Sequence, residues 1–231
     1  TEEGERDFVF YRDPGADMLL DQSDIIDLIF SGSGVFHFGS ITMTHEPSNS
    51  ATFKAIQLAR KYGYLVSFDP NLRPALWKTL DEAREKMRLG MELSDVVKLN
   101  EEEAMFIAET NTVEEAIRYL QRSYNLALVI ITLGKEGSIL VHQEKSLRVE
   151  GFPVHAVDTT GAGDGFVAGL ISSLYMFWND LRERKSIPDD TLRYAGRRAN
   201  AVGALTTLKK GAIPALPTQE EVEIFIEENP L

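Results

Sequence analysis

Apolar and polar positions along the chain follow two alternating patterns. Short apolar runs such as Tyr64-Leu65-Val66-Ser67-Phe68 are typical of buried strands. Each is followed by a longer segment in which apolar residues recur every three or four positions, as in a helix with one buried face. The pattern predicts strands at 35–38, 64–68, 95–99 and 127–133, and helices at 51–62, 79–93, 101–109 and 112–124.

This alternation of strands and helices predicts an α/β fold, with a mainly parallel sheet and helices on both of its faces. Segment 138–142 differs, because it returns through the turn at 134–137 and should pair as a hairpin with the strand before it. Three further helices are expected to start near Gly163, Pro188 and Thr218. Ligands of such sheets bind beyond the carboxyl ends of the strands, so we expect the chemistry in the loops there.

The first residues do not fit the alternation. Residues 7–12 form a short, partly alternating apolar segment that precedes the turn at Pro14 and Gly15. We interpret this segment as a strand outside the main sheet. An ordinary edge strand of that sheet is the alternative.

The segment VDTTGAGDGF at 157–166 joins the end of a strand, a glycine-rich turn and the start of a helix. Gly161 and Gly163 let the backbone turn tightly and come close to a ligand. The free amides and the positive dipole end of the following helix point into the turn, which suits a phosphate. Asp164 can accept a proton from an attacking hydroxyl, while the amides of Gly161, Ala162 and Gly163 stabilise a moving phosphoryl group. The alternative is an ordinary capped helix whose first turn carries an acid.

The DTTGAGD sequence at 158–164, followed by a helix of small residues, resembles the signature of the PfkB or ribokinase-like family of sugar kinases. Within that family, segments 10–20, 36–40 and 69–77 look most like a fructokinase. The resemblance extends to about Leu216. It implies a ribokinase-like three-layer αβα sandwich with a small β lid, to which residues 1–16 would contribute a strand and its return.

Members of this family normally begin with a further segment that carries the first strands and residues that hold the sugar. Because this chain opens at Thr1 with what resembles a lid strand, we expect residues 1–231 to be one ribokinase-like domain, incomplete at its N-terminus. No linker or repeat supports a second domain. A lid with exposed apolar faces would pair with a second subunit, which predicts a homodimer through the lid.

The resemblance implies ATP-dependent phosphorylation of a sugar hydroxyl, with magnesium as the metal. Fructose, converted to fructose 6-phosphate, is the favoured substrate, and 2-keto-3-deoxygluconate and ribose are the alternatives. A sensor that binds sugar or nucleotide without catalysis is the alternative of another class. A dinucleotide-binding oxidoreductase is disfavoured because Phe166 stands where its fingerprint needs a third small residue. A P-loop enzyme is excluded because the chain has no P-loop motif.

Polar residues at two other strand ends are candidates for the site. Arg73 follows the strand that ends near Asp69, and it could neutralise phosphate or bind the sugar; a structural pair with Asp69 is the alternative. Arg12 is the second candidate for substrate binding. Asn100 and Glu103 have the spacing of a capping box. The resemblance implies that Asn100 also contacts ATP and that Glu103 lies near magnesium through water.

The resemblance also assigns residues around the nucleotide and a monovalent cation. Asp158 matches a position where many members of the family bind potassium. His37, inside a strand, is interpreted as a core residue rather than a ligand. The resemblance implies that the remaining ATP contacts are Thr132, Gly134, Lys135, Gly137, Asn200 and Gly211. Without the resemblance, these residues would be interpreted as a hairpin turn, a helix residue and a C-terminal cap.

Composition narrows the partners. A chain of 231 residues with 43% hydrophobic content can bury a substantial core. Its 24 basic and 36 acidic residues give a net charge of −12, which argues against nucleic acid as a partner. The resemblance implies that sugar and nucleotide are the partners. The absence of cysteine fits a cytoplasmic protein, and the apolar runs are too short to span a bilayer.

Overall fold

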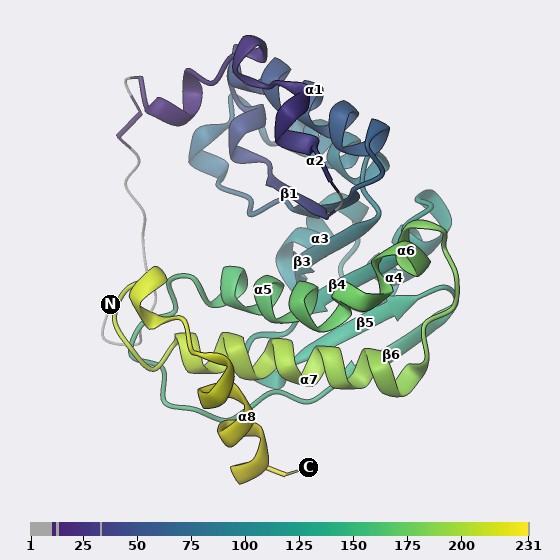
Figure 1. Cartoon of the computed structure of the whole chain (residues 1–231), viewed down its shortest axis with the longest axis vertical. Helices are drawn as coiled ribbons and strands as arrows, with labels where there is room; N and C mark the ends of the chain where they lie inside the picture. The colour runs from purple at the N-terminus through teal and green to yellow at the C-terminus, as the bar shows by residue number, and fades with distance from the viewer. Residues whose placement is uncertain (1–10, 13, 33, 231) are drawn as a thin grey trace.

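The computed structural model describes residues 11–12, 14–32 and 34–230, and a six-stranded sheet forms the centre of this part of the chain (Figure 1). Its strands follow one another in sequence order, and the first four are parallel, whereas the last two pair as antiparallel neighbours. The mainly parallel sheet and the hairpin are therefore confirmed. The strands are β1 (Val35–Gly39), β2 (Leu65–Asp69), β3 (Val96–Asn100), β4 (Leu128–Thr132), β5 (Ser138–His142) and β6 (Lys145–Val149).

Helices cover both faces of the sheet and complete the three-layer αβα sandwich that the sequence predicts. One face carries α1 (Ser48–Lys61), α2 (Leu80–Glu92), α3 (Glu101–Ala108) and α4 (Val113–Ser123). The other carries α5 (Ala162–Leu174), α6 (Trp178–Arg182) and α7 (Asp189–Thr206), with α8 (Gln219–Glu228) against α7. Figure 1 shows α5 and α7 side by side. None of the helices in the described part of the chain is long and apolar enough to cross a membrane.

Short 3-10 helices occupy many of the connections. Their bounds are η1 (Ala16–Met18), η2 (Gln22–Asp24), η3 (Asp27–Phe30), η4 (Ile41–Met43), η5 (Pro74–Leu76), η6 (Gly134–Glu136), η7 (Tyr175–Phe177) and η8 (Ile213–Ala215).

Alternation along each strand divides the core into two clusters. On β3, Val97 and Leu99 pack with α1 to α4, whereas Val96 packs with α5 and α7. Side chains at even spacing along a strand share a face, so Lys98 and Asn100 lie on the same face as Val96. This alternation of side chains between the two faces decides which polar side chains meet at the carboxyl end of the sheet.

Helix α5 lies close against α7 because glycines form its inner surface. A Cβ added at Gly169 would lie 2.9 Å from Val202 Cγ2 and 3.1 Å from Ala199 Cα. Gly165 is similar, since a Cβ there would lie 2.7 Å from Thr206 Oγ1. The close approach of the two helices fixes the position of the first turn of α5.

The predicted elements are confirmed within a few residues at their ends, but strand β6, helix α6 and the 3-10 helices were not predicted. Strand β6 buries only Leu147 and Val149 and is otherwise exposed, so its apolar signal is weak. Helix α6 has five residues, too few to show helical periodicity. The lid predicted over residues 1–16 falls largely on residues outside the described ranges, so it stays a prediction.

Candidate active site

On the α5 side of the sheet, the strands change from apolar at their amino ends to polar at their carboxyl ends. The apolar residues are Val35, Leu65, Val96 and Leu128, which pack with α5 and its neighbours. Two or four positions further along the same strands, and therefore on the same face, stand His37, Asp69, Lys98 and Thr132. Four strands thus deliver polar side chains to one edge, next to the start of α5.

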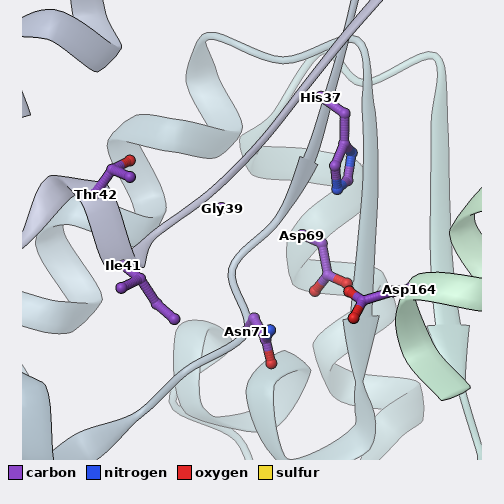
Figure 2. A pocket seen from close by; sticks show the side chains of 7 residues that line it. All are labelled: His37, Gly39, Ile41, Thr42, Asp69, Asn71 and Asp164. Carbon is purple, nitrogen blue, oxygen red and sulfur yellow. The ribbon is translucent and has the colours of Figure 1, made fainter. Parts of the chain in front are cut away.

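A first cavity of about 210 Å³ opens at this edge. Figure 2 shows His37, Asp69 and Asp164 on one side of this cavity and Ile41 and Thr42 on the other. Asn71, which follows β2 with a φ of 51°, forms another part of its wall. Gly39 also lines it.

A second cavity of about 240 Å³ adjoins the first, because Asp69, Asn71 and Asp164 line both. It is the most highly charged of the three cavities at this edge. Its other lining residues are Arg73, Lys98, Thr159, Thr160, Gly161 and Gly163.

A third cavity of about 340 Å³ continues from the second through Thr159 and Gly163, which line both. Its walls are mostly apolar and include Phe152, Val154 and Phe166. Predicted nucleotide residues that line it are Thr132, Gly134, Lys135, Gly137 and Asn200. The three cavities therefore follow one another along a path that passes the glycine turn.

The glycine turn adopts the conformation that its sequence predicts. Gly161 caps α5 with a φ of +79°, a region that favours glycine, and a Cβ there would lie 2.9 Å from Ala212 Cβ. Ala162, Gly163 and Asp164 form the first turn of α5, whose amides have no acceptor within the helix, and the Ala162 amide donates to the Thr159 carbonyl at 3.2 Å. These amides and the positive end of the helix dipole stand where the second and third cavities join.

Asp69 and Lys98 form an ion pair of 3.1 Å between Oδ2 and Nζ in the wall of the second cavity. Burial raises the pKa of the Asp69 carboxyl, Lys98 opposes that rise, and Asp164 adds to it. Lys98 was not among the residues predicted from the sequence. The available signal was a charged residue inside an otherwise apolar strand, on the same face as Asn100.

His37 lies on the wall of the first cavity, so its interpretation as a core residue is wrong. Its side chain is exposed, and its Nδ1 lies 3.1 Å from Ser67 Oγ. The protein around the imidazole displaces water, which lowers the pKa of His37 below its ordinary value, although the charge of Asp164 acts in the opposite direction. In the part of the chain that the structure describes, β1 pairs only with β2, and a polar side chain on it can face an open cavity.

Asp158 and Gly211 tie the loop before the turn to the segment after α7. Asp158 Oδ2 accepts a hydrogen bond of 2.9 Å from the Gly211 amide, and Oδ1 accepts one of 2.7 Å from the Thr160 amide. Asn200 is buried and donates to the carbonyls of Val149 and Glu150 at 3.2 and 3.0 Å. Asn200 therefore holds the strand end that forms the wall of the third cavity.

Five predicted site residues lie outside the three cavities: Arg12, Asn100, Glu103, Asp158 and Gly211. Arg12 donates to Thr44 Oγ1 at 3.2 Å and forms an ion pair with Asp17. Asn100 and Glu103 form the capping box of α3.

Glu103 is held by backbone groups. Its Oε1 accepts a hydrogen bond of 2.7 Å from the Leu72 amide and its Oε2 one of 2.9 Å from the Asn100 amide. Its side chain is buried, and this burial raises the pKa of the carboxyl. The magnesium role of Glu103 stays a prediction.

Comparison with known proteins agrees with this arrangement. Residues 1–219 match the family model described as pfkB family carbohydrate kinase. Probable fructokinase-4 of Arabidopsis thaliana is 42% identical over 231 residues, covering 98% of this chain and 68% of the relative. Probable fructokinase-6, chloroplastic, of the same plant is 44% identical over 224 residues, covering 96% of this chain and 57% of the relative.

Solved structures show the same fold. A fructokinase from Vibrio cholerae O395, a double mutant with fructose, ADP and potassium ion bound, superposes with a TM-score of 0.82 at 36% identity, covering 92% of this chain and 66% of that one. A fructokinase from Xylella fastidiosa with bound ATP gives 0.86 at 31% identity, covering 99% of this chain and 72% of that one.

The αβα sandwich, with a helix start at the carboxyl edge of its sheet, is therefore the ribokinase-like fold that the sequence predicts. The family match covers nearly the whole chain, and the chain belongs to the pfkB family of carbohydrate kinases, which are phosphotransferases. The chain spans 68% and 57% of the lengths of the two curated relatives compared.

Proposed function

We propose that this protein transfers the terminal phosphoryl group of ATP to a sugar hydroxyl, with fructose as the favoured substrate and fructose 6-phosphate as the product. The observation that carries this proposal is the path of three adjoining cavities, in which Asp164 lines the first and second and Gly163 the second and third. The first cavity would take the sugar, the second the phosphoryl group and the third the nucleotide. The similar structure that holds fructose and ADP supports this assignment.

In the proposed reaction, Asp164 accepts the proton of the sugar hydroxyl while the hydroxyl oxygen forms its bond to the terminal phosphorus. The bond between that phosphorus and the bridging oxygen breaks, and ADP leaves with the electron pair. The first-turn amides of α5, at Ala162, Gly163 and Asp164, stabilise the charge on the moving group. Arg73, in the same cavity wall, supplies positive charge near the phosphates.

The third cavity has the features that a nucleotide needs. Phe152, Val154 and Phe166 offer an apolar surface to a base, and Thr132 and Lys135 stand among polar groups of the same wall. We propose that Gly134, Gly137, Asn200 and Gly211 complete the nucleotide contacts, with Asn100 at the adjoining strand end.

Metal ions complete the proposal. Among residues 11–12, 14–32 and 34–230, no three acidic or histidine side chains converge on one point as a metal site. This arrangement fits magnesium carried by a triphosphate, because such an ion keeps several waters and needs only one or two carboxylates. Asp69 and Asp164 are the carboxylates of the second cavity, and Glu103 would act through water. When bound, magnesium would neutralise phosphate charge.

Asp158 is proposed to bind a monovalent cation near the turn. Potassium is present in one similar fructokinase structure and calcium in another. Both carboxylate oxygens of Asp158 already accept backbone hydrogen bonds, which orients them beside Thr160 and Gly211. Omitting potassium from the assay tests this part of the proposal.

The decisive experiment measures phosphate transfer from ATP with magnesium to fructose, ribose, 2-keto-3-deoxygluconate and tagatose in parallel. We expect fructose to give the highest kcat/KM. Transfer confined to another sugar would keep the kinase and overturn the fructose assignment. Nucleotide binding without transfer to any of the four would favour a sensor.

The proposal also includes a cytoplasmic location and a homodimer formed through the lid, with no nucleic-acid partner. The absence of cysteine supports the cytoplasmic location. The net charge of −12 argues against a nucleic-acid partner. Measurement of the molecular mass in solution tests the dimer.

A further inference from the structure

Lys98 has no role in the reaction described above, although it lies in the wall of the second cavity. Its Nζ lies 3.1 Å from Asp69 Oδ2 and 3.1 Å from the point that a Cβ on Gly163 would occupy. The ammonium group therefore lies against the glycine turn, in the wall of the cavity that is proposed to take the phosphoryl group.

Stability alone does not explain a lysine at this position. Its side chain is 12% exposed, and its neighbours on the same sheet face, Val96 and Ile130, are buried apolar residues. Burying a lysine and an aspartate costs free energy of desolvation. A well-packed apolar pair of similar volume would often make the folded protein equally stable or more stable.

The charges around the cavity favour a role for Lys98 toward a bound anion. The titratable side chains that line the first and second cavities are His37, Asp69, Arg73, Lys98 and Asp164. Arg73 Nη1 donates to the Leu72 carbonyl at 3.0 Å, whereas the hydrogen bond of Lys98 to Asp69 occupies one of its three donors. An ammonium on a flexible stem can turn toward a charge that moves during a reaction.

We propose that Lys98 neutralises the phosphoryl group during its transfer, and that Asp69 is the positioning residue that holds Lys98 against the turn. This inference rests on the proposed function. Charge on the three outer oxygens of the phosphoryl group is stabilised by the α5 amides on one side and by Lys98 Nζ on the other. The alternative is that Lys98 serves only as the structural partner of Asp69.

Three variants separate these roles: Lys98→Met, Asp69→Asn and the double variant, which removes both charges. If Lys98 acts on the phosphoryl group, Lys98→Met lowers kcat by about 10²- to 10³-fold with a smaller change in KM for ATP. The double variant should then be as slow as Lys98→Met, whereas Asp69→Asn, which keeps an acceptor for the ammonium, should be less affected. Recovery of the double variant to the rate of Asp69→Asn would overturn the proposal.

Two further measurements separate the role of Lys98 from effects on folding and from the proposed kinase function itself. Lys98→Arg keeps the charge and should recover part of kcat, and thermal unfolding shows which variants fold. If the unmodified protein transfers phosphate to no sugar, the proposed function fails, and calorimetric titration with ATP and with ADP then tests Lys98. We expect Lys98→Met to weaken ATP binding and leave ADP binding unchanged, and an equal effect on both nucleotides, or none, would overturn the role of Lys98.

Discussion

At the scale of single residues, Asp69 and Asp164 are two carboxylates that line the same cavities in different environments. Asp69 is buried beside Lys98, and burial raises its pKa. Asp164 is exposed in the first turn of α5 and reaches both the first and the second cavity. The accessible carboxylate is the better placed of the two to meet a substrate hydroxyl, which is why the base is assigned to Asp164.

Replacing Asp164 by asparagine tests this assignment. The variant keeps the shape of the side chain and removes the proton acceptor, so we expect kcat to fall by about 10²- to 10⁴-fold. Thermal unfolding should change little because the side chain is exposed. Asp190→Asn, which changes another exposed first-turn acid on α7, is the matched control and should keep full activity. Near-normal turnover of Asp164→Asn would refute the assignment.

Glu103 gives a prediction for stability against pH. Burial raises the pKa of this carboxyl above its ordinary value of 4.5, so the folded state binds its proton more tightly than the unfolded state does. The associated stability is fully present below pH 4.5 and is lost as the pH rises through the folded-state pKa. Unfolding free energies should therefore favour the unmodified protein over Glu103→Gln more at pH 4.5 than at pH 8. A difference that does not depend on pH would contradict this prediction.

At the scale of elements, the placing of α5 against α7 decides where the glycine turn lies. Gly169 brings α5 within reach of the Ala199 backbone, and Asp158 ties the loop before the turn to Gly211 after α7. The anion site is thus built by two helices and the loop between the sheet and α5. An error in that packing would move the turn away from the strand ends.

Gly169→Ala tests this packing. The added Cβ would lie 2.9 Å from Val202 Cγ2 and 3.1 Å from Ala199 Cα, so we expect a loss of about 1–3 kcal/mol in the free energy of unfolding. Gly203→Ala on α7 is the control, because its Cβ would lie no closer than 3.3 Å to any neighbour and should cost less. Chemical denaturation of both variants measures the difference. Equal losses would mean that contact at Gly169 does not limit the packing.

At the scale of the whole molecule, the path of three cavities crosses the edge of the sheet from β1 to the hairpin. The first cavity is formed by the ends of β1 and β2, and the third by the ends of β4 to β6 with α5 and α7. Sugar and nucleotide would therefore bind at opposite ends of this edge of the sheet and meet at the start of α5. Substitutions at the two ends of the path should act independently.

Bulky residues at the two ends provide the measurement. Ala156→Trp narrows the third cavity from an exposed position, so we expect KM for ATP to rise several-fold with little change in KM for the sugar. Ile41→Trp at the first cavity should show the reverse pattern. Each variant is the control of the other. A rise in both constants for either variant would contradict the separate assignment of the cavities.

Much of the fold could be predicted because its signals are local. Helix α2 begins after Thr79, whose side chain accepts from the Glu82 amide, and the apolar spacing that follows is visible in the sequence. Strand β6 was missed because only two of its residues are buried. At the site, Gly161 and Asp164 were found because the turn and its acid lie three residues apart. His37 was misinterpreted because the sequence does not show which side of β1 faces a cavity.

The sequence by itself determined the kinds of element, their order and the glycine turn, because each depends on interactions among neighbouring residues. Only the tertiary structure decided that Lys98, Asp69 and His37 meet at that turn. Lys98 and Asp69 are 29 positions apart and come together because β2 and β3 are parallel neighbours in register. That register depends on which face of each strand is buried under the helices, and this burial involves residues that are far apart in the chain.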